Sequence, residues 1–440
     1  MKRVLRHRRA KPGLRRELGL WEATVYGIGI ILGAGIYALI GEGIAMAGNS
    51  IWLSFVFAAV VAALTGLSYM ELITIFPRAA AEYTYVKHAF RNRLLAFNIG
   101  WMEIFAGVVA TTAVALGFAG YLNVLTGVPV VAGAAGLIIV MSVINFLGIK
   151  ESSKLNTIFT LIELSGLVMV IALAAMFGKF GSVDYLEMPN GMTGTIGAAS
   201  LIFFAYLGFQ EMANISEESK SPRKILPRAL LYAVIITTAI YILVGISVVS
   251  IVDWHLIAES NAPLAFVVSS VIGEQAFWVM SVIALFATSN TVLVGMIVCS
   301  RMIYGMAMDG SLPRVFAKVH RGRCTPWVAV LVTMALSLAF LGIGEIGIIA
   351  SVTDLSVFYT FTFVNAAVII LRYRMPKTKR EFMVPGNIGR FPVLPAIGIL
   401  ATLLLASNLV YESVLIGAGI ISVGVIVYLV FIRRKSEKIV

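Results

Sequence analysis

The chain contains twelve apolar stretches, each close to the length that a helix needs to cross a membrane. A spanning helix takes about 20 predominantly apolar residues. The strands of a membrane barrel would be about ten residues long and alternate in polarity, and that pattern is missing from the sequence. The sequence therefore predicts an all-α polytopic membrane protein. The predicted spans are residues 20–45, 51–76, 94–124, 129–148, 156–178, 192–215, 227–252, 275–300, 326–343, 346–371, 393–410 and 412–432.

Composition excludes a water-soluble fold. Of the 440 residues, 60% are hydrophobic and 13% are charged, and the mean hydropathy is +0.95. A soluble domain has about 45–50% apolar and about 25% charged residues. This chain lacks the polar side chains that would be needed to cover a surface in contact with water.

The net charge of +12 reflects membrane topology and not nucleic-acid binding. If the N-terminus is cytoplasmic, 33 of the 34 Lys and Arg residues fall in cytoplasmic loops or tails, and Lys179 is the exception. Cytoplasmic loops are enriched in basic residues in this way. We therefore expect a multi-pass protein of the cell membrane with both termini in the cytoplasm. The basic tail, residues 1–19, is expected to touch anionic lipid.

Two of the predicted spans contain small residues where a helix would break. Gly33 and Gly35 lie in the first span, and residues 205–209 (AYLGF) lie in the middle of the sixth. Small residues also allow helices to pack closely. However, interrupted segments at corresponding places in two halves of a chain point to a transporter binding site. Unwound backbone at membrane depth is tolerated where it lines a cavity, so we expect the substrate there.

Five motifs make the chain resemble a family of membrane transporters. It is similar to amino acid permeases of the amino acid–polyamine–organocation superfamily, nearest the cationic amino acid transporter-like branch. The resemblance extends from about residue 18 to 432. The motifs are Gly33-Ala34-Gly35-Ile36; Tyr69-Met70-Glu71-Leu72 with Pro77 and Glu82-Tyr83; residues 204–209; Glu217-Glu218 with Pro222 and Pro227; and Arg301 with residues 308–313.

The resemblance implies a leucine-transporter-type fold, with two inverted repeats of five helices and two further helices at the C-terminus. The repeats would be residues 20–178 and 192–371, and the additional pair 393–432. A cytoplasmic tail, residues 433–440, would follow. Short helices are implied near residues 83–89 on the inside and 254–263 on the outside.

The resemblance also implies where a substrate binds. The amides around Ala34 and Gly35 would meet a carboxylate, and carbonyls of the sixth span would meet an ammonium group. Phe204 would be an aromatic gate over the substrate; without the resemblance, a lipid-facing aromatic is the alternative. The expected substrate-binding residues are Ile31, Gly33, Ala34, Gly35, Phe204, Ala205, Leu207 and Gly208.

Glu163 is the sharpest candidate for energy coupling, because ionisable groups at membrane depth are costly and usually functional. In the proton-coupled permeases that the chain resembles, a lysine occupies this position. Three interpretations stay open. Glu163 carries the coupling proton, or it binds Na⁺ together with Thr288 or Ser289, or it is a protonated structural group in an exchanger.

Four further carboxylates fall inside predicted spans. Glu71 and Glu211 lie near the cytoplasmic ends, where an interfacial salt bridge is the simplest expectation. Glu103 also lies nearer the cytoplasmic face, and Asp354 lies about two turns from the outside. The sequence assigns neither of these two a role.

The sequence predicts a secondary transporter and not an enzyme. Its four His residues share no metal-binding spacing, no intramembrane base accompanies the Ser residues, and no ATP-binding motif is present. We expect no metal or other cofactor. The leading hypothesis is proton-coupled amino acid uptake by alternating access. An exchanger or a Na⁺-coupled symporter is the alternative, and a channel or transporter-like receptor is a remote one. The sequence leaves side-chain specificity and oligomeric state open.

Overall fold

The computed structural model describes residues 14–260, 262–341, 346–409 and 411–432. Most of the predicted basic tail 1–19 and the whole tail 433–440 lie outside these residues. In the described part, nine helical segments are long and apolar enough to cross a membrane, and the first of them, Leu20–Ile75, contains two helices. Two shorter apolar helices, Trp327–Ala339 and Val393–Ala406, match the ninth and eleventh predicted spans. The all-α polytopic prediction is confirmed.

The first five predicted spans correspond to five helices joined by short turns. Asn92 begins the third of these by accepting a hydrogen bond from the Leu95 amide at 3.1 Å, which satisfies a donor at the helix start. A short helix, α3 (Ala81–Phe90), precedes it near the predicted position. The five spans are α1 (Leu20–Ala47), α2 (Ile51–Ile75), α4 (Arg93–Thr126), α5 (Val130–Leu147) and α6 (Ile149–Phe177).

The sixth to tenth spans form a second set. Two short helices, α9 (Trp254–Ala258) and α10 (Pro263–Ile272), stand between the seventh and eighth spans, where a short helix was expected. The members of the set are α7 (Gly191–Ile202), with 3₁₀ turns at Phe203–Tyr206, Gln210–Ala213 and Ser216–Glu218, then α8 (Pro222–Ile251), α11 (Glu274–Met308), α12 (Trp327–Ala339) and α13 (Ile346–Arg374).

A small hairpin separates this set from the last two helices. Its strands, β1 (Asn387–Ile388) and β2 (Phe391–Pro392), pair antiparallel. They are followed by α14 (Val393–Ala406) and α15 (Tyr411–Val427), which continues into a π-helical turn at Tyr428–Ile432.

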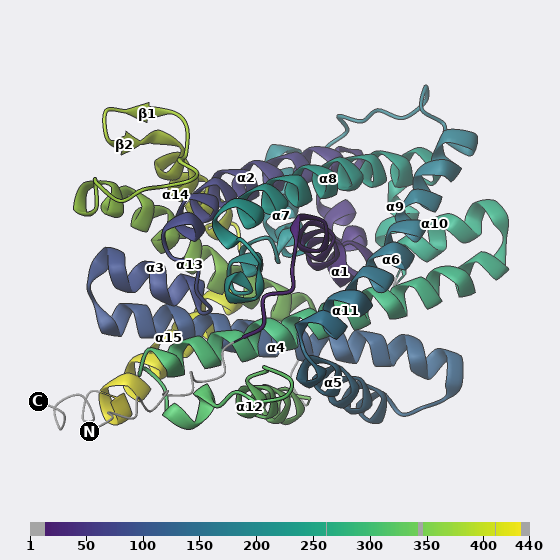
Figure 1. Cartoon of the computed structure of the whole chain (residues 1–440). Coiled ribbons are helices and arrows are strands. Elements are labelled where there is room, and N and C mark those ends of the chain that lie inside the picture. Colours follow the sequence, from purple (N-terminus) through teal and green to yellow (C-terminus); the bar gives the residue numbers. More distant parts are fainter. Residues whose placement is uncertain (1–13, 261, 342–345, 410, 433–440) are drawn as a thin grey trace, which may run out of the picture.

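Helices at corresponding positions of the two predicted repeats pack against one another. The pairs are α1 with α7, α2 with α8, α4 with α11, and α5 with α12. Helix α1 also contacts α6 and α11, so it lies inside the bundle (Figure 1). The division into two inverted repeats stays a prediction, and this pairing agrees with it.

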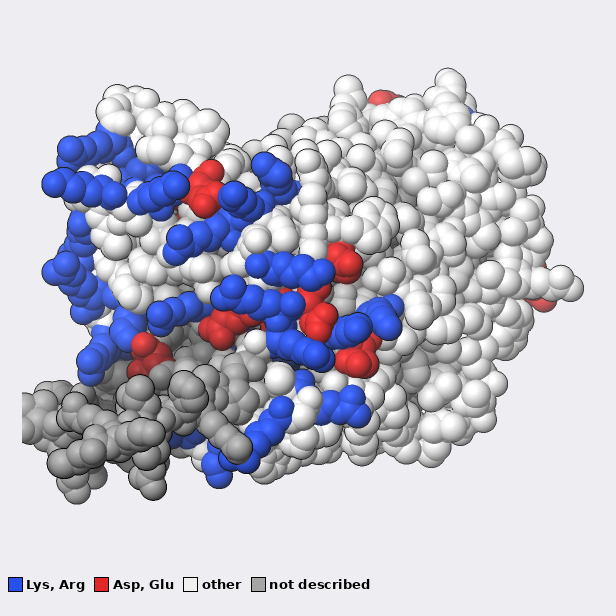
Figure 2. Space-filling model, viewed as in Figure 1, with Lys and Arg blue, Asp and Glu red and all other residues white. Residues whose placement is uncertain are grey.

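Charge is distributed unevenly over the molecule. In Figure 2, Lys and Arg side chains gather over the left half of the view, where Figure 1 places α3 and the hairpin. The right half, where α9 and α10 lie, shows few charged atoms. We call the left end the basic end.

Candidate transport site

The first span is broken at Gly33, as predicted. Gly33 departs from helical geometry within α1 (φ 15°, ψ −168°). A break frees the amides that begin the following helical segment, and one of them, the Ala34 amide, donates to Thr291 Oγ1 of α11 at 2.8 Å. The break therefore presents polar backbone in the interior of the bundle.

The sixth span is broken over a longer segment. Helix α7 ends at Ile202, and Leu207 is extended (φ −59°, ψ 141°). Gly208 follows with φ +122°, a conformation that favours glycine. Its amide donates to Gln210 Oε1 at 3.0 Å.

The two breaks touch each other. A Cβ added to Gly35 would lie 2.7 Å from Ala205 Cα, and one added to Gly208 would lie 1.9 Å from Ile30 Cγ2. Real side chains would clash at these separations. The approach of the two breaks therefore requires glycine at both positions.

A cavity of about 80 Å³ lies at the breaks. A larger space of about 1380 Å³, which we call the vestibule, adjoins it and is bordered by residues of α10 and of the segment before it, on the side opposite the basic end. Ala34 and Phe204 line both spaces. Phe204 thus faces both spaces and not lipid, and its role as a gate stays a prediction.

Seven of the eight expected substrate-binding residues line the cavity. Ala205 is the exception: it is buried, it contacts Gly35, and its carbonyl accepts a hydrogen bond from the Tyr241 hydroxyl at 2.8 Å. The seven lining residues are Ile31, Gly33, Ala34, Gly35, Phe204, Leu207 and Gly208.

The expected coupling residues lie apart from the cavity. Glu163 of α6 is fully buried, and neither carboxylate oxygen has a hydrogen-bond partner among the described residues. Its main-chain carbonyl accepts from the hydroxyl of Tyr37, which lines the vestibule, at 2.8 Å. Thr288 also lines the vestibule and donates to carbonyls of its own helix, whereas Ser289 is buried and lines neither space.

A cluster of amides and hydroxyls lies beside Glu163. The Asn290 side chain lies next to the carboxylate, and its amide donates to the Gly29 carbonyl at 3.1 Å. Asn290 Oδ1 accepts from Asn156 at 2.8 Å. These contacts join α6 and α11 to the segment of α1 just before its break.

The motifs that carry the family resemblance converge between the cavity and the basic end. Arg301 is fully buried and donates to both carboxylate oxygens of Glu218 at 2.9 and 3.3 Å. Glu82 accepts from Asn214 at 3.0 Å and from Tyr69 at 3.1 Å. We call these five residues the inner polar layer.

The chain segment before α1 covers this layer. The amides of Glu17 and Leu18 donate to the Glu218 carbonyl at 2.9 and 3.1 Å, and the Lys220 amide donates to the Leu18 carbonyl at 3.0 Å. The segment before α1, the 3₁₀ turn at Ser216–Glu218 and Arg301 of α11 are therefore joined by hydrogen bonds.

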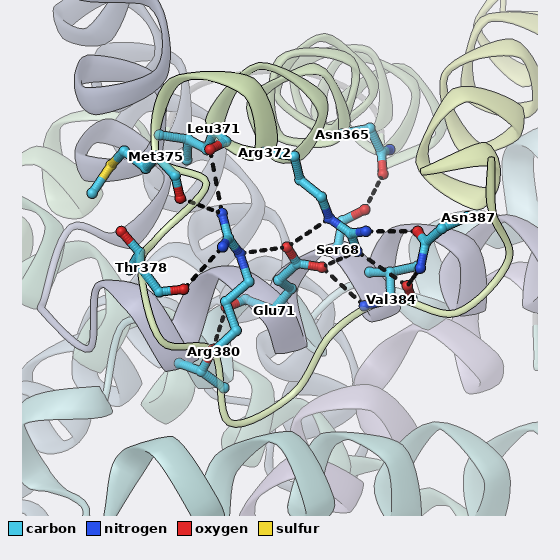
Figure 3. Close-up of polar contacts among 11 residues, drawn as sticks. Ser68, Glu71, Asn365, Leu371, Arg372, Met375, Thr378, Arg380, Val384 and Asn387 are labelled. Atoms are coloured by element: carbon cyan, nitrogen blue, oxygen red, sulfur yellow. Dashed lines mark hydrogen bonds and ion pairs between the residues drawn. The ribbon is translucent and has the colours of Figure 1, made fainter. Parts of the chain in front are cut away.

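Glu71 forms the salt bridge that was expected of it (Figure 3). It accepts from Arg372 Nε at 3.0 Å and Nη2 at 2.6 Å, and it forms an ion pair with Arg380 at 3.0 Å. The Val384 amide donates to it at 2.9 Å. Glu71 therefore binds the segment between α13 and the hairpin to the end of α2.

Glu211 differs from the expectation. The described residues form no ion pair with it, and it lines the cavity together with Glu103. The break bends the chain after Gly208, so Glu211 faces inward and not towards the membrane interface. Asp354 is fully buried, and both its carboxylate oxygens lack a hydrogen-bond partner among the described residues.

The sequence did not predict three residues that bond to the backbone at or near the breaks: Tyr241, Asn290 and Thr291. The last two belong to a polar run, residues 288–291, within an apolar span, and that run was the available signal. Tyr241 lies in α8 among apolar residues and gave no signal.

Spanning helices, two of them broken beside an internal cavity, are the architecture of a membrane transport protein. The chain belongs to the amino acid permease family, whose model matches residues 18–432. This confirms the resemblance that the motifs indicated.

Individual relatives agree over almost the whole chain. The branched-chain amino acid permease BcaP of Bacillus subtilis is 30% identical, with 97% of this chain and 95% of that protein covered. The methylthioribose transporter of the same organism is also 30% identical, covering 96% and 95%. Mouse cationic amino acid transporter 4 is 29% identical over 83% of this chain and 61% of its own length. These relatives are named as permeases and transporters, not enzymes.

Proposed function

We propose that this protein is a secondary active transporter that takes up amino acids by alternating access, driven by protons. One observation carries the proposal: a cavity at two touching helix breaks lies behind a single aromatic side chain, Phe204, on one side and the inner polar layer on the other. A site that is closed on one side and gated on the other is what alternating access requires. The eight expected substrate-binding residues belong to this proposal.

The substrate we propose is a neutral or basic amino acid. The cavity wall includes the carboxylates of Glu103 and Glu211, and no Lys or Arg is among the described residues that line it. An acidic side chain would find no cationic partner among these residues, and burying an unpaired charge is costly. The α-carboxylate would be held at the start of the helical segment that follows Gly33, where the helix dipole favours an anion.

Glu163 is the proton carrier in this proposal. A buried carboxylate without a cationic partner is costly in its charged form. Glu163 also lies close to the vestibule, because Tyr37, which lines the vestibule, donates its hydroxyl to the Glu163 main-chain carbonyl. A Na⁺ site with Thr288 or Ser289 is less well supported, because no hydrogen bond among the described residues joins either hydroxyl to the Glu163 carboxylate and Ser289 lines neither space.

The protein is also proposed to lie in the cell membrane with its basic end in the cytoplasm. Of its 34 Lys and Arg residues, 33 fall on the side assigned to the cytoplasm, and Figure 2 shows most of the visible ones over the left and centre of the view, with few on the right. The vestibule would then open to the outside, as uptake requires, and both termini would be cytoplasmic.

The experiment compares wild type with Glu163→Gln in proteoliposomes. A thermal-shift screen of the purified protein against the amino acids, at two pH values and with and without Na⁺, first finds a ligand. Uptake driven by a pH gradient should then be lost in Glu163→Gln, while counterflow of the same amino acid persists. Glu151→Gln is the matched control, because Glu151 is exposed in the first turn of the same helix.

The alternatives give different outcomes. Normal gradient-driven uptake by Glu163→Gln would rule out this residue as the proton carrier. Uptake by the wild type that needs Na⁺ would indicate a symporter of that ion. Counterflow with no response to any ion gradient would indicate an exchanger. Currents far above transporter turnover would indicate a channel, and binding without flux a receptor.

A further inference from the structure

We infer that Tyr241 is a positioning residue that holds the two helix breaks in the register that binds an amino acid. This inference rests on the proposed function, because it concerns the same site. Tyr241 lies in α8, is fully buried, and does not line the cavity. Its effect on a substrate would therefore act through the backbone of its neighbours.

The Tyr241 hydroxyl is surrounded by three main-chain carbonyls. It lies 2.5 Å from the Ile31 oxygen and 3.2 Å from the Leu32 oxygen, both in the turn before the first break. It also lies 2.8 Å from the oxygen of Ala205 in the second break. One side chain of the seventh span thus contacts both breaks.

The aromatic ring of Tyr241 is held in place by its neighbours. The Phe55 ring lies 5.4 Å away between centroids, and the Tyr206 ring lies 5.2 Å away at an interplanar angle of 90°. Edge-to-face packing of this kind is favourable and directional. Because the ring is held from two sides, the position of the hydroxyl is set by α8, by Phe55 of α2 and by Tyr206 of the second broken segment.

A hydroxyl has one proton to donate, so it cannot fully satisfy three carbonyls at once. The carbonyls of Ile31, Leu32 and Ala205 consequently form an electronegative group that is drawn together by a single donor. Without the donor they would repel one another and separate. The segment from Phe204 to Leu207, which presents the carbonyls expected to meet a substrate ammonium, would move with Ala205.

The glycine contacts support this role. Gly35 lies against Ala205, and Gly208 lies against Ile30, with no room for a side chain at either place. These contacts set how closely the breaks approach, but a van der Waals contact does not set their rotation. The directional bonds of Tyr241 supply that missing constraint.

The test is Tyr241→Phe, which keeps the ring packing and removes only the donor. Binding of L-leucine and L-arginine to purified protein should weaken about fivefold, since a lost hydrogen bond of this kind costs about 1 kcal/mol and 1.4 kcal/mol is a factor of ten. In proteoliposomes, KM for the bound amino acid should rise by a similar factor while the maximal rate stays within about twofold.

The matched control is Tyr185→Phe. The Tyr185 hydroxyl lies 2.7 Å from Ser250 Oγ, so this variant removes a tyrosine contact to the same helix, α8, far from the breaks. Its KM should stay unchanged. The apo thermal midpoints of both variants should lie close to that of wild type, which separates a positioning effect from a general loss of stability.

Three outcomes would overturn the inference: unchanged affinity in Tyr241→Phe, tighter binding because the Ala205 carbonyl is released, or an equal loss in Tyr185→Phe. If Tyr241→Phe does not fold, 3-fluorotyrosine at position 241 keeps the hydroxyl and makes it a stronger donor. Binding should then be tighter than in wild type, and unchanged or weaker binding would refute the role. A wild type that binds no amino acid would instead refute the proposed function.

Discussion

Replacement of Glu71 by Ala should release the segment between α13 and α14 from the end of α2. Glu71 is 1% exposed and is shared by Arg372 and Arg380, and it also accepts the Val384 amide (Figure 3). The substitution removes the only anion of this group and leaves two guanidinium groups facing one another. The segment would then lose the two ion pairs that attach it to α2.

The size of the effect follows from the remaining contacts. Removing one partner of a buried ion pair costs about 3–5 kcal/mol. The lower end of this range is expected here, because the side chain of Arg372 keeps Asn387 at 2.6 Å and the Val384 carbonyl at 3.0 Å. Arg380 keeps carbonyls at Leu371, Met375 and Thr378. About 3 kcal/mol corresponds to an increase of about 100-fold in local opening.

Limited trypsin digestion measures this opening. Arg380 is largely buried, so cleavage after it requires the segment to leave its site, and the cleavage rate tracks the open population when opening is fast. The rate should rise by about two orders of magnitude in Glu71→Ala, with the site identified by mass spectrometry. Glu381→Ala is the control, because Glu381 is exposed on the same segment. Equal cleavage of Glu71→Ala and wild type would refute the reasoning.

Two further variants test the site and the inner polar layer. Gly208→Ala should abolish uptake, because φ at this position is +122° and the new Cβ would lie 1.9 Å from Ile30 Cγ2. The control, Gly181→Ala, should leave uptake unchanged, because no atom lies within 4 Å of a Cβ at that position. Full uptake by Gly208→Ala would show that the breaks need not touch. Burial raises the pKa of Glu82 to about 7 from 4.5. The stabilisation from this shift is present below pH 4.5 and lost as pH rises through 7. The thermal midpoint should therefore fall between pH 5 and 8, and less steeply in Glu82→Gln; equal slopes would contradict this assignment.

The predicted spans and breaks agree with the structure because both depend on local properties of the chain. A span is recognised by its length and apolarity, and the break at Gly33 by the run of small residues around it. The same reasoning placed a break at residues 205–209, and the structure has non-helical backbone at Leu207 and Gly208.

The partners of the buried charges could not be predicted in the same way. Glu71 and Arg372 are 301 residues apart, and Arg301 and Glu218 are 83 apart. Glu71 and Glu211 looked alike in sequence, as acidic residues near the ends of spans. Glu71 forms a salt bridge, whereas Glu211 lines the cavity. The difference arises because the break turns the backbone just before Glu211, and Glu71 has no such break beside it.

The sequence by itself determined the class of protein, because the thickness of a bilayer sets the length of an apolar helix and basic residues accumulate on one side of it. Only the tertiary structure decided how the site is built. Tyr241 lies in an ordinary apolar span, and nothing in its neighbours along the chain marks it. Its hydroxyl reaches three carbonyls, two just before the first break and one in the second, because α8 packs against α1.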